Sequence, residues 1–107
     1  MTALVRGRVY RVDLGGSIGL EPMLVVTNNR RNKAFGDALC VRITTSDKPD
    51  MDSIVPLAAA DAPLVGRVLC DDYYVVYPDE VHTDLGAVTA ATMARVCDGL
   101  KASLLIP

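Results

Sequence analysis

The sequence predicts a mainly β domain of about six short strands that ends in one helix. Apolar runs rich in valine, isoleucine and leucine recur through the first three quarters of the chain, bounded by Gly, Pro, Asn or Asp. Helical spacing of apolar residues is clear only in residues 90–104. A chain of 107 residues, 50% hydrophobic, suffices for one core. We therefore expect residues 1–107 to form a single domain.

The composition also limits the function classes. No apolar run approaches the roughly 20 residues of a membrane span, so we expect no membrane contact. The three cysteines, Cys40, Cys70 and Cys97, are odd in number and far apart, which is typical of reduced thiols in a cytoplasmic protein. With one histidine and no paired cysteines, we expect neither a metal site nor a cofactor.

The first strands are predicted at Arg6–Leu14 and Pro22–Thr27. The second is an unbroken apolar run, which indicates burial on both faces. The loop between them, Gly15–Gly19, contains Ser17. A glycine-rich loop can hold a phosphate, but this one matches neither the P-loop nor the dinucleotide pattern, so a plain connector is the alternative.

The densest polar and basic cluster is Asn28–Lys33, which contains Asn28, Asn29, Arg30 and Arg31. Asparagine amides can read base edges, and arginines can hold phosphates or stack on bases, so the cluster is a candidate RNA contact. The alternative is a solvated turn, because asparagine is an ordinary turn residue.

The candidate site lies in Asp37–Lys48, an apolar strand that ends in hydroxyls and charge. Side chains alternate along a strand, so Arg42 and Thr44 share one face while the apolar residues between them take the other. A guanidinium beside a hydroxyl suits phosphate binding or phosphodiester chemistry. Just beyond lie the further polar residues Thr45, Ser46 and Lys48. The alternative is an edge strand that runs into a polar turn.

Three more strands are expected at Met51–Leu57, Val65–Leu69 and Tyr73–Val76. Pro56 places the first of them at an edge of the sheet. The pair Asp71-Asp72 is interpreted as a solvated turn between the other two, with a metal-ligand or acid–base pair as the alternative.

The chain is expected to end in helical structure. Pro78–Val81 fits a single turn with proline first, and His82 after it is expected on the surface. Thr89 caps a helix over Ala90–Leu104. Its apolar stripe for packing on the sheet consists of Met93, Val96, Cys97, Leu100 and Leu104.

Charge is unevenly distributed along the chain. Residues 1–48 hold eight Lys/Arg and four Asp/Glu, a balance of +4, and residues 49–107 hold three and nine, a balance of −6. We therefore expect a polyanion to meet the first half.

Five segments, in this order, resemble MazF/PemK-type toxins: RGRVYRVDLG, PMLVVTNN, VRITTS, DDYYVVYPDEV and VTAATMARVCDGL. The resemblance covers nearly the whole chain. It implies an SH3-like small barrel of the MazF/PemK (CcdB-like) type with a C-terminal helix, and a homodimer. It also implies a type II toxin that inhibits translation by cutting single-stranded RNA without metal. The cognate antitoxin would carry an acidic, disordered tail.

The resemblance assigns residue roles as well. Thr44 occupies the place of the family's catalytic threonine in VRITTS. The family's catalytic arginine precedes a proline at the start of the second strand, but this chain reads Gly19-Leu-Glu-Pro22 and lacks it. Glu21 corresponds to a glutamate of that motif. Arg42 is the expected substitute, and the competing cations are Arg8, Arg11, Arg30 and Arg31.

Two functions follow. The first is a sequence-specific endoribonuclease in which the ribose 2′-OH attacks phosphorus, giving 2′,3′-cyclic phosphate and 5′-OH ends. Its catalytic residues would be Thr44, Arg42 and Glu21, and its substrate mRNA, with rRNA or tRNA as alternatives. Its RNA contacts would be Ser17, Asn28, Asn29, Arg30, Arg31, Thr45, Ser46 and Lys48. The second is a non-catalytic RNA-binding or gyrase-targeting toxin module of the same fold.

Overall fold

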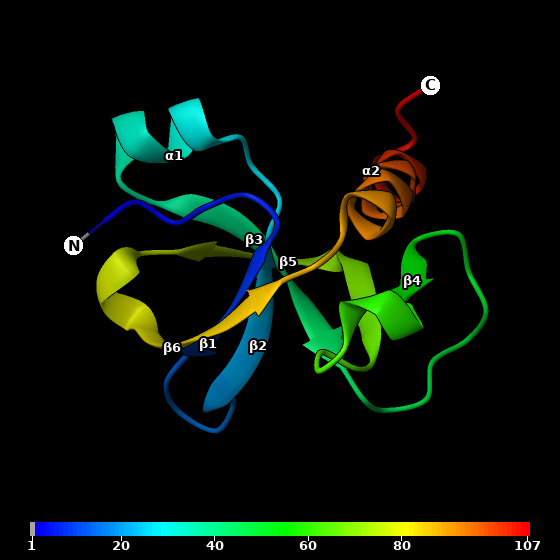
Figure 1. Cartoon of the computed structure of the whole chain (residues 1–107), viewed down its shortest axis with the longest axis horizontal. Coiled ribbons are helices and arrows are strands. Elements are labelled where there is room, and N and C mark those ends of the chain that lie inside the picture. The colour runs from blue at the N-terminus through cyan, green and yellow to red at the C-terminus, as the bar shows by residue number, and fades with distance from the viewer. Residues whose placement is uncertain (1) are drawn as a thin grey trace.

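The computed structural model describes residues 2–107 as one curled, six-stranded antiparallel sheet with a long helix packed against it (Figure 1). The strand order is β4-β5-β3-β2-β1-β6. The end strands β4 and β6 do not pair with each other, so the sheet stays open. The strands are β1 (Arg8–Asp13), β2 (Leu20–Val25), β3 (Ala38–Thr44), β4 (Ile54–Pro56), β5 (Arg67–Val76) and β6 (Val81–Ala87).

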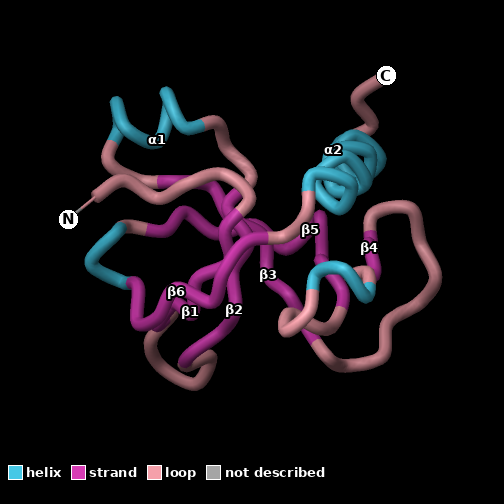
Figure 2. The backbone as a smooth tube through the Cα atoms, viewed as in Figure 1, coloured by secondary structure: helices cyan, strands magenta, loops and turns pink. Residues whose placement is uncertain are grey.

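Helices lie on both sides of the curled sheet, as the tube in Figure 2 shows. The predicted C-terminal helix is confirmed as α2 (Ala90–Leu104), capped by the Thr89 side chain, which accepts a hydrogen bond from the Thr92 amide. It packs on β5 and β4. The other helical elements are α1 (Asn29–Phe35), η1 (Ala59–Asp61) and η2 (Pro78–Glu80). No helix among residues 2–107 is long and apolar enough to cross a membrane.

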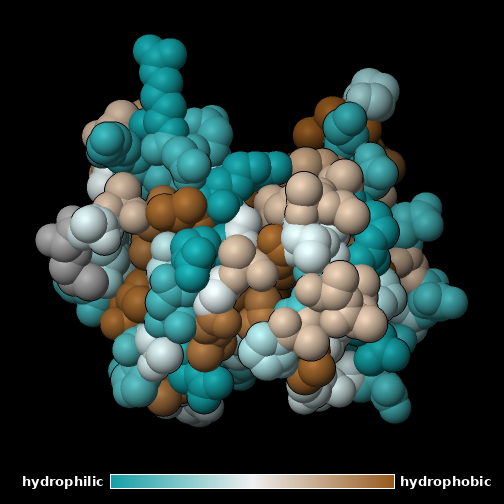
Figure 3. Space-filling model, viewed as in Figure 1, coloured by the Kyte–Doolittle hydropathy of each residue, from teal (hydrophilic) through white to brown (hydrophobic). Residues whose placement is uncertain are grey.

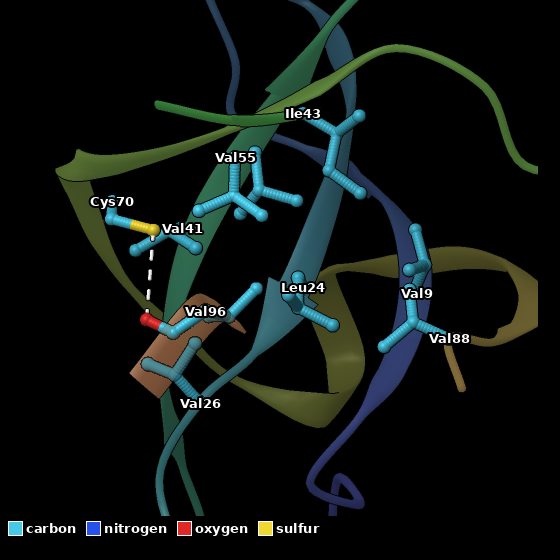
Figure 4. Packing of buried hydrophobic residues seen from close by; sticks show 10 residues of the cluster. Val9, Leu24, Val26, Val41, Ile43, Val55, Cys70, Val88 and Val96 are labelled. Carbon is cyan, nitrogen blue, oxygen red and sulfur yellow. Dashed lines mark hydrogen bonds between the residues drawn. The ribbon is translucent and has the colours of Figure 1, made fainter. Parts of the chain in front are cut away.

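The central strands are buried on both faces because their alternate side chains enter two separate apolar clusters. One cluster, between the sheet and α2, contains Leu24, Val41 and Val96 (Figure 4). The other contains Met23 and Val25. This confirms the two-sided burial predicted from the unbroken apolar run of β2.

Two expectations about local structure were wrong. Residues 28–33 do not form a turn: Asn28 caps α1 by accepting a hydrogen bond from the Arg31 amide at 2.8 Å. Asparagine favours turns and helix N-caps alike, so its presence did not discriminate between them. Asp71-Asp72 does not separate two strands, because β5 runs through both residues. The strand β6, with exposed His82 near its start, was not expected at all.

The irregular pairing of β5 explains the aspartate pair. Val41 of β3 lies opposite Tyr73, and Ile43 lies opposite Val68. Two residue steps of β3 therefore face five steps of β5, and Asp71 and Asp72 lie in that bulge. A bulge lets a strand carry residues that the regular ladder would not place there.

The charge difference between the two halves of the chain does not produce two separate faces. Strands from both halves alternate in the sheet, with β6 beside β1 and β5 beside β3. Arg8 pairs with Asp84 at 3.0 Å and Arg42 with Asp72 at 2.7 Å, so acids of the second half neutralise arginines of the first. Hydrophilic side chains gather over α1 on the face shown in Figure 3.

Candidate functional site

The start of β2 and the end of β3 form one pocket of about 280 Å³. The two strands are antiparallel neighbours, with Met23 opposite Arg42, so the first residues of β2 lie beside the last residues of β3. The polar side chains that line the pocket are Glu21, Arg42, Thr44, Thr45 and Ser46. The structure thus brings together five of the predicted site residues, from segments more than 20 positions apart.

Arg42 is the cation of this pocket. Its neighbours Val41 and Ile43 are buried while Arg42 itself is half-buried, as the strand alternation predicted. Nε donates to Oδ2 of Asp72 at 2.7 Å, and Nη1 lies 3.8 Å from Oε1 of Glu21. The hydrogen bond with Asp72 raises the pKa of Arg42, partly opposed by burial and reinforced by the charges of Asp72 and Glu21. The guanidinium is therefore a fixed positive charge between two carboxylates.

The Thr44 hydroxyl lies on the same face as Arg42. Its Oγ1 accepts a hydrogen bond from the Ser46 amide at 3.1 Å, which turns the chain away from the sheet. Because that bond uses a lone pair of the oxygen, the hydroxyl proton remains available for donation. The Thr44 side chain can therefore donate to a phosphate oxygen in the pocket.

The backbone of Gly66 lies close against that of Thr44, and this residue was not singled out from the sequence. Its φ is +119°, and a Cβ there would overlap the Thr44 carbonyl oxygen. Only glycine allows this close approach of two backbones. An isolated glycine inside the predicted strand Val65–Leu69 was the available signal.

Lys48 lies on the other side of Arg42. A second hollow of about 320 Å³ is lined by Arg42, Lys48 and Asp72, among others. Asp72 was not recognised as a site residue because the aspartate pair was interpreted as a turn. Among residues 2–107, no group of three or more His, Cys, Asp or Glu side chains is arranged to hold a metal ion.

The cluster at residues 28–31 lies apart from the pocket. It begins α1, which precedes β3, so it lies at the end of β3 opposite Thr44. The six steps from Ala38 to Thr44 at ~3.3 Å each separate the two ends of the strand by about 20 Å. Asn28 caps the helix, and Asn29 Oδ1 accepts from the Arg6 amide at 2.7 Å. Both asparagines thus have structural partners, and neither lines the pocket.

The remaining candidates of the cluster and the glycine loop are also outside the pocket. Arg31 donates to the Asp37 carbonyl at 2.7 Å and lies over the Phe35 ring, 5.0 Å from its centroid. Arg30 and Ser17 are exposed, on α1 and in the β1–β2 loop respectively. The structure therefore separates these predicted RNA contacts from the Thr44 pocket.

Of the competing cations on β1, only one is near the site. Arg8 is committed to Asp84, with Nε and Nη2 both donating to the carboxylate. Arg11 lines an apolar groove of about 340 Å³ that shares Pro22 and Thr45 with the pocket. Arg11 is thus the nearest alternative to Arg42.

Comparison with known proteins identifies the family. A family model described as "PemK-like, MazF-like toxin of type II toxin-antitoxin system" matches residues 5–104. The chain belongs to this family. Endoribonuclease MazF1 of Mycobacterium bovis and endoribonuclease MazF4 of Mycobacterium tuberculosis are each 39% identical over 107 residues, covering 100% of this toxin and 98% of the relative. The toxin is also similar to a solved mycobacterial "endoribonuclease in complex with its cognate antitoxin", with a TM-score of 0.90, 39% identity and 98% of each chain covered.

These comparisons confirm the toxin family, the fold class and the endoribonuclease class expected from the sequence. The barrel-like sheet is open in this toxin, as its strand order shows. More distant members, such as the MazF of Deinococcus radiodurans at 20% identity and a TM-score of 0.80, share the fold.

Proposed function

We propose that this toxin, acting as one domain of residues 1–107, cleaves single-stranded RNA, chiefly mRNA, in the Thr44 pocket without a metal ion. The observation that carries the proposal is the arrangement of Arg42 and Thr44 on one face at the end of β3, with Glu21 3.8 Å from the guanidinium. A base, a cation and a hydroxyl donor are thus gathered in one pocket of this endoribonuclease toxin.

The proposed reaction uses each of the three groups. Glu21 accepts the proton of the ribose 2′-OH, whose oxygen forms a bond to the adjacent phosphorus. The P–O5′ bond breaks and the 5′ oxygen takes a proton from solvent, leaving 2′,3′-cyclic phosphate and 5′-OH ends. Arg42 and the Thr44 hydroxyl donate to the phosphoryl oxygens as negative charge develops on them.

Residues around these three are proposed to hold the strand. Thr45 and Ser46 line the same pocket, and Lys48 lies beyond Arg42, so the three can contact the phosphates on either side of the cleavage point. Cleavage requires a 2′-OH, so RNA and not DNA is the substrate, and an open single strand can enter a pocket of this size. The site of action would be the cytoplasm, where cutting mRNA stops translation.

We also propose two protein partners. The first is a cognate antitoxin with an acidic, disordered tail, supported by the toxin–antitoxin family and by the antitoxin complex of the similar mycobacterial structure. The second is another copy of the toxin, supported by exposed apolar side chains at the C-terminus, where Leu105 is 89% and Ile106 52% exposed. Sedimentation at micromolar concentration should show a species heavier than the 11.4 kDa chain.

The test of the function is cleavage of a long RNA in EDTA. We expect discrete cuts whose downstream fragments accept phosphate directly from a polynucleotide kinase, because their 5′ ends carry hydroxyls. Intact RNA, together with RNA binding or gyrase inhibition, would instead support the non-catalytic toxin module of the same fold.

A further inference from the structure

Asp72 bonds to Arg42 but does not itself line the Thr44 pocket. Its Oδ2 accepts the Arg42 Nε hydrogen at 2.7 Å, and both side chains are partly buried, at 26% exposed for Arg42 and 30% for Asp72. We propose that Asp72 is a positioning residue, which orients Arg42 so that its terminal nitrogens present a fork to the substrate phosphate. The inference rests on the proposed function of Arg42.

The hydrogen-bond geometry is consistent with Nε–H bonding to Asp72 and the terminal N–H groups bonding to the phosphate. Arginine has five N–H donors in a planar fork, one on Nε and four on the two terminal nitrogens. Asp72 uses the Nε donor, which leaves the outer edge of the fork for a phosphate, the arrangement that bidentate phosphate binding requires. Glu21, 3.8 Å from Nη1, is too far for a hydrogen bond and does not occupy that edge.

The position of Asp72 depends on the β5 bulge. Between Val68 and Tyr73 the strand carries extra residues relative to β3, and this irregular segment brings the Asp72 carboxylate beside Arg42. Tyr74 lies on the same face two residues later. Burial, and then the negative charge of Asp72, raises the pKa of the Tyr74 phenol.

Two other roles for Asp72 predict different results. A half-exposed ion pair contributes little to fold stability, so a purely structural role predicts little change in any property on losing the charge. A purely electrostatic effect predicts improvement, since a carboxylate beside a phosphate site repels RNA. Only positioning predicts slower cleavage together with unchanged or tighter RNA binding.

The experiment separates kcat from KM. We expect Asp72→Asn to lower kcat by about tenfold to a hundredfold, the range for a displaced catalytic group, with KM for RNA unchanged or lower. Asp71→Asn is the matched control, because Asp71 is the exposed neighbour and loses the same charge. We expect its kcat to stay within about twofold of wild type, as for a surface change.

A double-mutant cycle tests whether Asp72 acts through Arg42. In an Arg42→Ala background, Asp72→Asn should cause no further loss of kcat, since the group that it orients is gone. An equal loss in both backgrounds would overturn the inference, as would a wild-type kcat in Asp72→Asn when Arg42→Ala is inactive. Full activity of Arg42→Ala, or no cleavage by wild type, would instead overturn the proposed function and this inference with it.

A second measurement does not depend on activity or on RNA. The Nε–H resonance of Arg42 in the NMR spectrum of the folded protein should be shifted and protected from exchange in wild type and in Asp71→Asn. In Asp72→Asn it should move toward the position of a solvated arginine. An unchanged Arg42 resonance in Asp72→Asn would overturn the inference.

Discussion

Two carboxylates of this toxin, Asp61 in η1 and Asp72 in β5, each link their element to a neighbouring one, but in opposite surroundings. Asp61 is 2% exposed and accepts three hydrogen bonds, from the Ala58 and Thr89 amides at 2.8 Å and from the Thr92 hydroxyl at 2.6 Å. It closes η1 onto the N-terminus of α2. The Asp72 side chain is 30% exposed and holds one charged partner, Arg42.

The difference separates a contact within the fold from a contact at the proposed site. The three neutral donors around Asp61 all bond to its carboxylate and stabilise it. None of these hydrogen bonds is left for a ligand. The donors of Arg42 are only partly consumed and border a pocket. We therefore infer the proposed site from the free N–H donors of Arg42 beside the pocket and not from the presence of an ion pair alone.

At the proposed site, beside Arg42 and Asp72, the largest expected effect is that of Thr44→Ala. Loss of one donor to the developing charge typically lowers the rate by about 10²–10³-fold, measured as single-turnover cleavage. Thr44→Ser keeps the hydroxyl and should keep most of the rate. The fold should change little, because only the bond to the Ser46 amide is lost, worth about 0.5–1.5 kcal/mol.

Thr45→Ala is the matched control for that experiment, since Thr45 is the adjacent exposed hydroxyl in the same pocket. We expect a smaller loss, mainly in RNA binding. An inactive Thr45→Ala beside an active Thr44→Ala would show that the catalytic hydroxyl is one position further along the chain.

At the buried carboxylate, Asp61→Asn should lower the free energy of unfolding by about 2–3 kcal/mol at neutral pH. The Nδ2 group that replaces one carboxylate oxygen cannot accept a hydrogen bond, so a backbone amide becomes unsatisfied. Cleavage per folded molecule should not change. Urea unfolding measures the first quantity and a titrated activity assay the second. A loss of activity without a loss of stability would contradict the separation of the two regions.

The pH dependence of the free energy of unfolding, compared between wild type and Asp61→Asn, is a further test. Burial raises the pKa of Asp61, but the hydrogen bonds from Thr92, Thr89 and Ala58 outweigh it and leave the pKa below its ordinary value. The stabilisation is therefore complete above the unfolded pKa, about 3.9, and is lost as pH falls through the lower folded pKa. We expect the difference in free energy of unfolding between wild type and Asp61→Asn to become smaller below about pH 4.

Gly66→Ala should affect both stability and activity, because it changes the backbone packing that lies against Thr44. The added Cβ would overlap the Thr44 carbonyl oxygen, and φ is +119°, so the variant should lose about 1–3 kcal/mol of stability and displace Thr44. Thermal unfolding and the cleavage rate should fall together. A stable Gly66→Ala with a normal rate would show that this contact does not position Thr44.

The smallest effect concerns the thiols. Burial raises the pKa of Cys40 to about 12 and that of Cys70 to about 11, so neither supplies thiolate near neutral pH. Cys97 is only half-buried. Mass spectrometry after brief alkylation of the native protein should therefore show Cys97 modified first. Early modification of Cys40 would contradict the burial of that residue.

The sequence predicted the features that depend on local pattern. The first three strands, the edge strand with Pro56 and the helix over Ala90–Leu104 all follow from spacing and caps. The strand β6 was missed because its exposed sequence, VHTDLGA, shows no apolar alternation. The last residue of the predicted helical stripe, Leu104, is 55% exposed and lies beyond the packed surface.

The residues of the proposed site were likewise predictable only where a local sequence pattern places them. Arg42 and Thr44 share a face because of strand periodicity, and Glu21 lies at the start of β2, the strand that pairs with theirs. Asp72 was out of reach, because its position depends on the register between β3 and β5 and on a bulge in it. Long-range register is a property of the assembled sheet, so no local pattern reports it.

The central claim is that Arg42 supplies the cation that stabilises the cleavage transition state. The most direct test is single-turnover cleavage of one RNA in EDTA by wild type, Arg42→Lys and Arg42→Ala. We expect Arg42→Ala to lose about 10²–10³-fold in rate. Arg42→Lys should fall between, because it keeps the charge and loses the fork. Near-equal rates in all three proteins would contradict the claim and would direct the search to Arg11, the other cation beside the pocket.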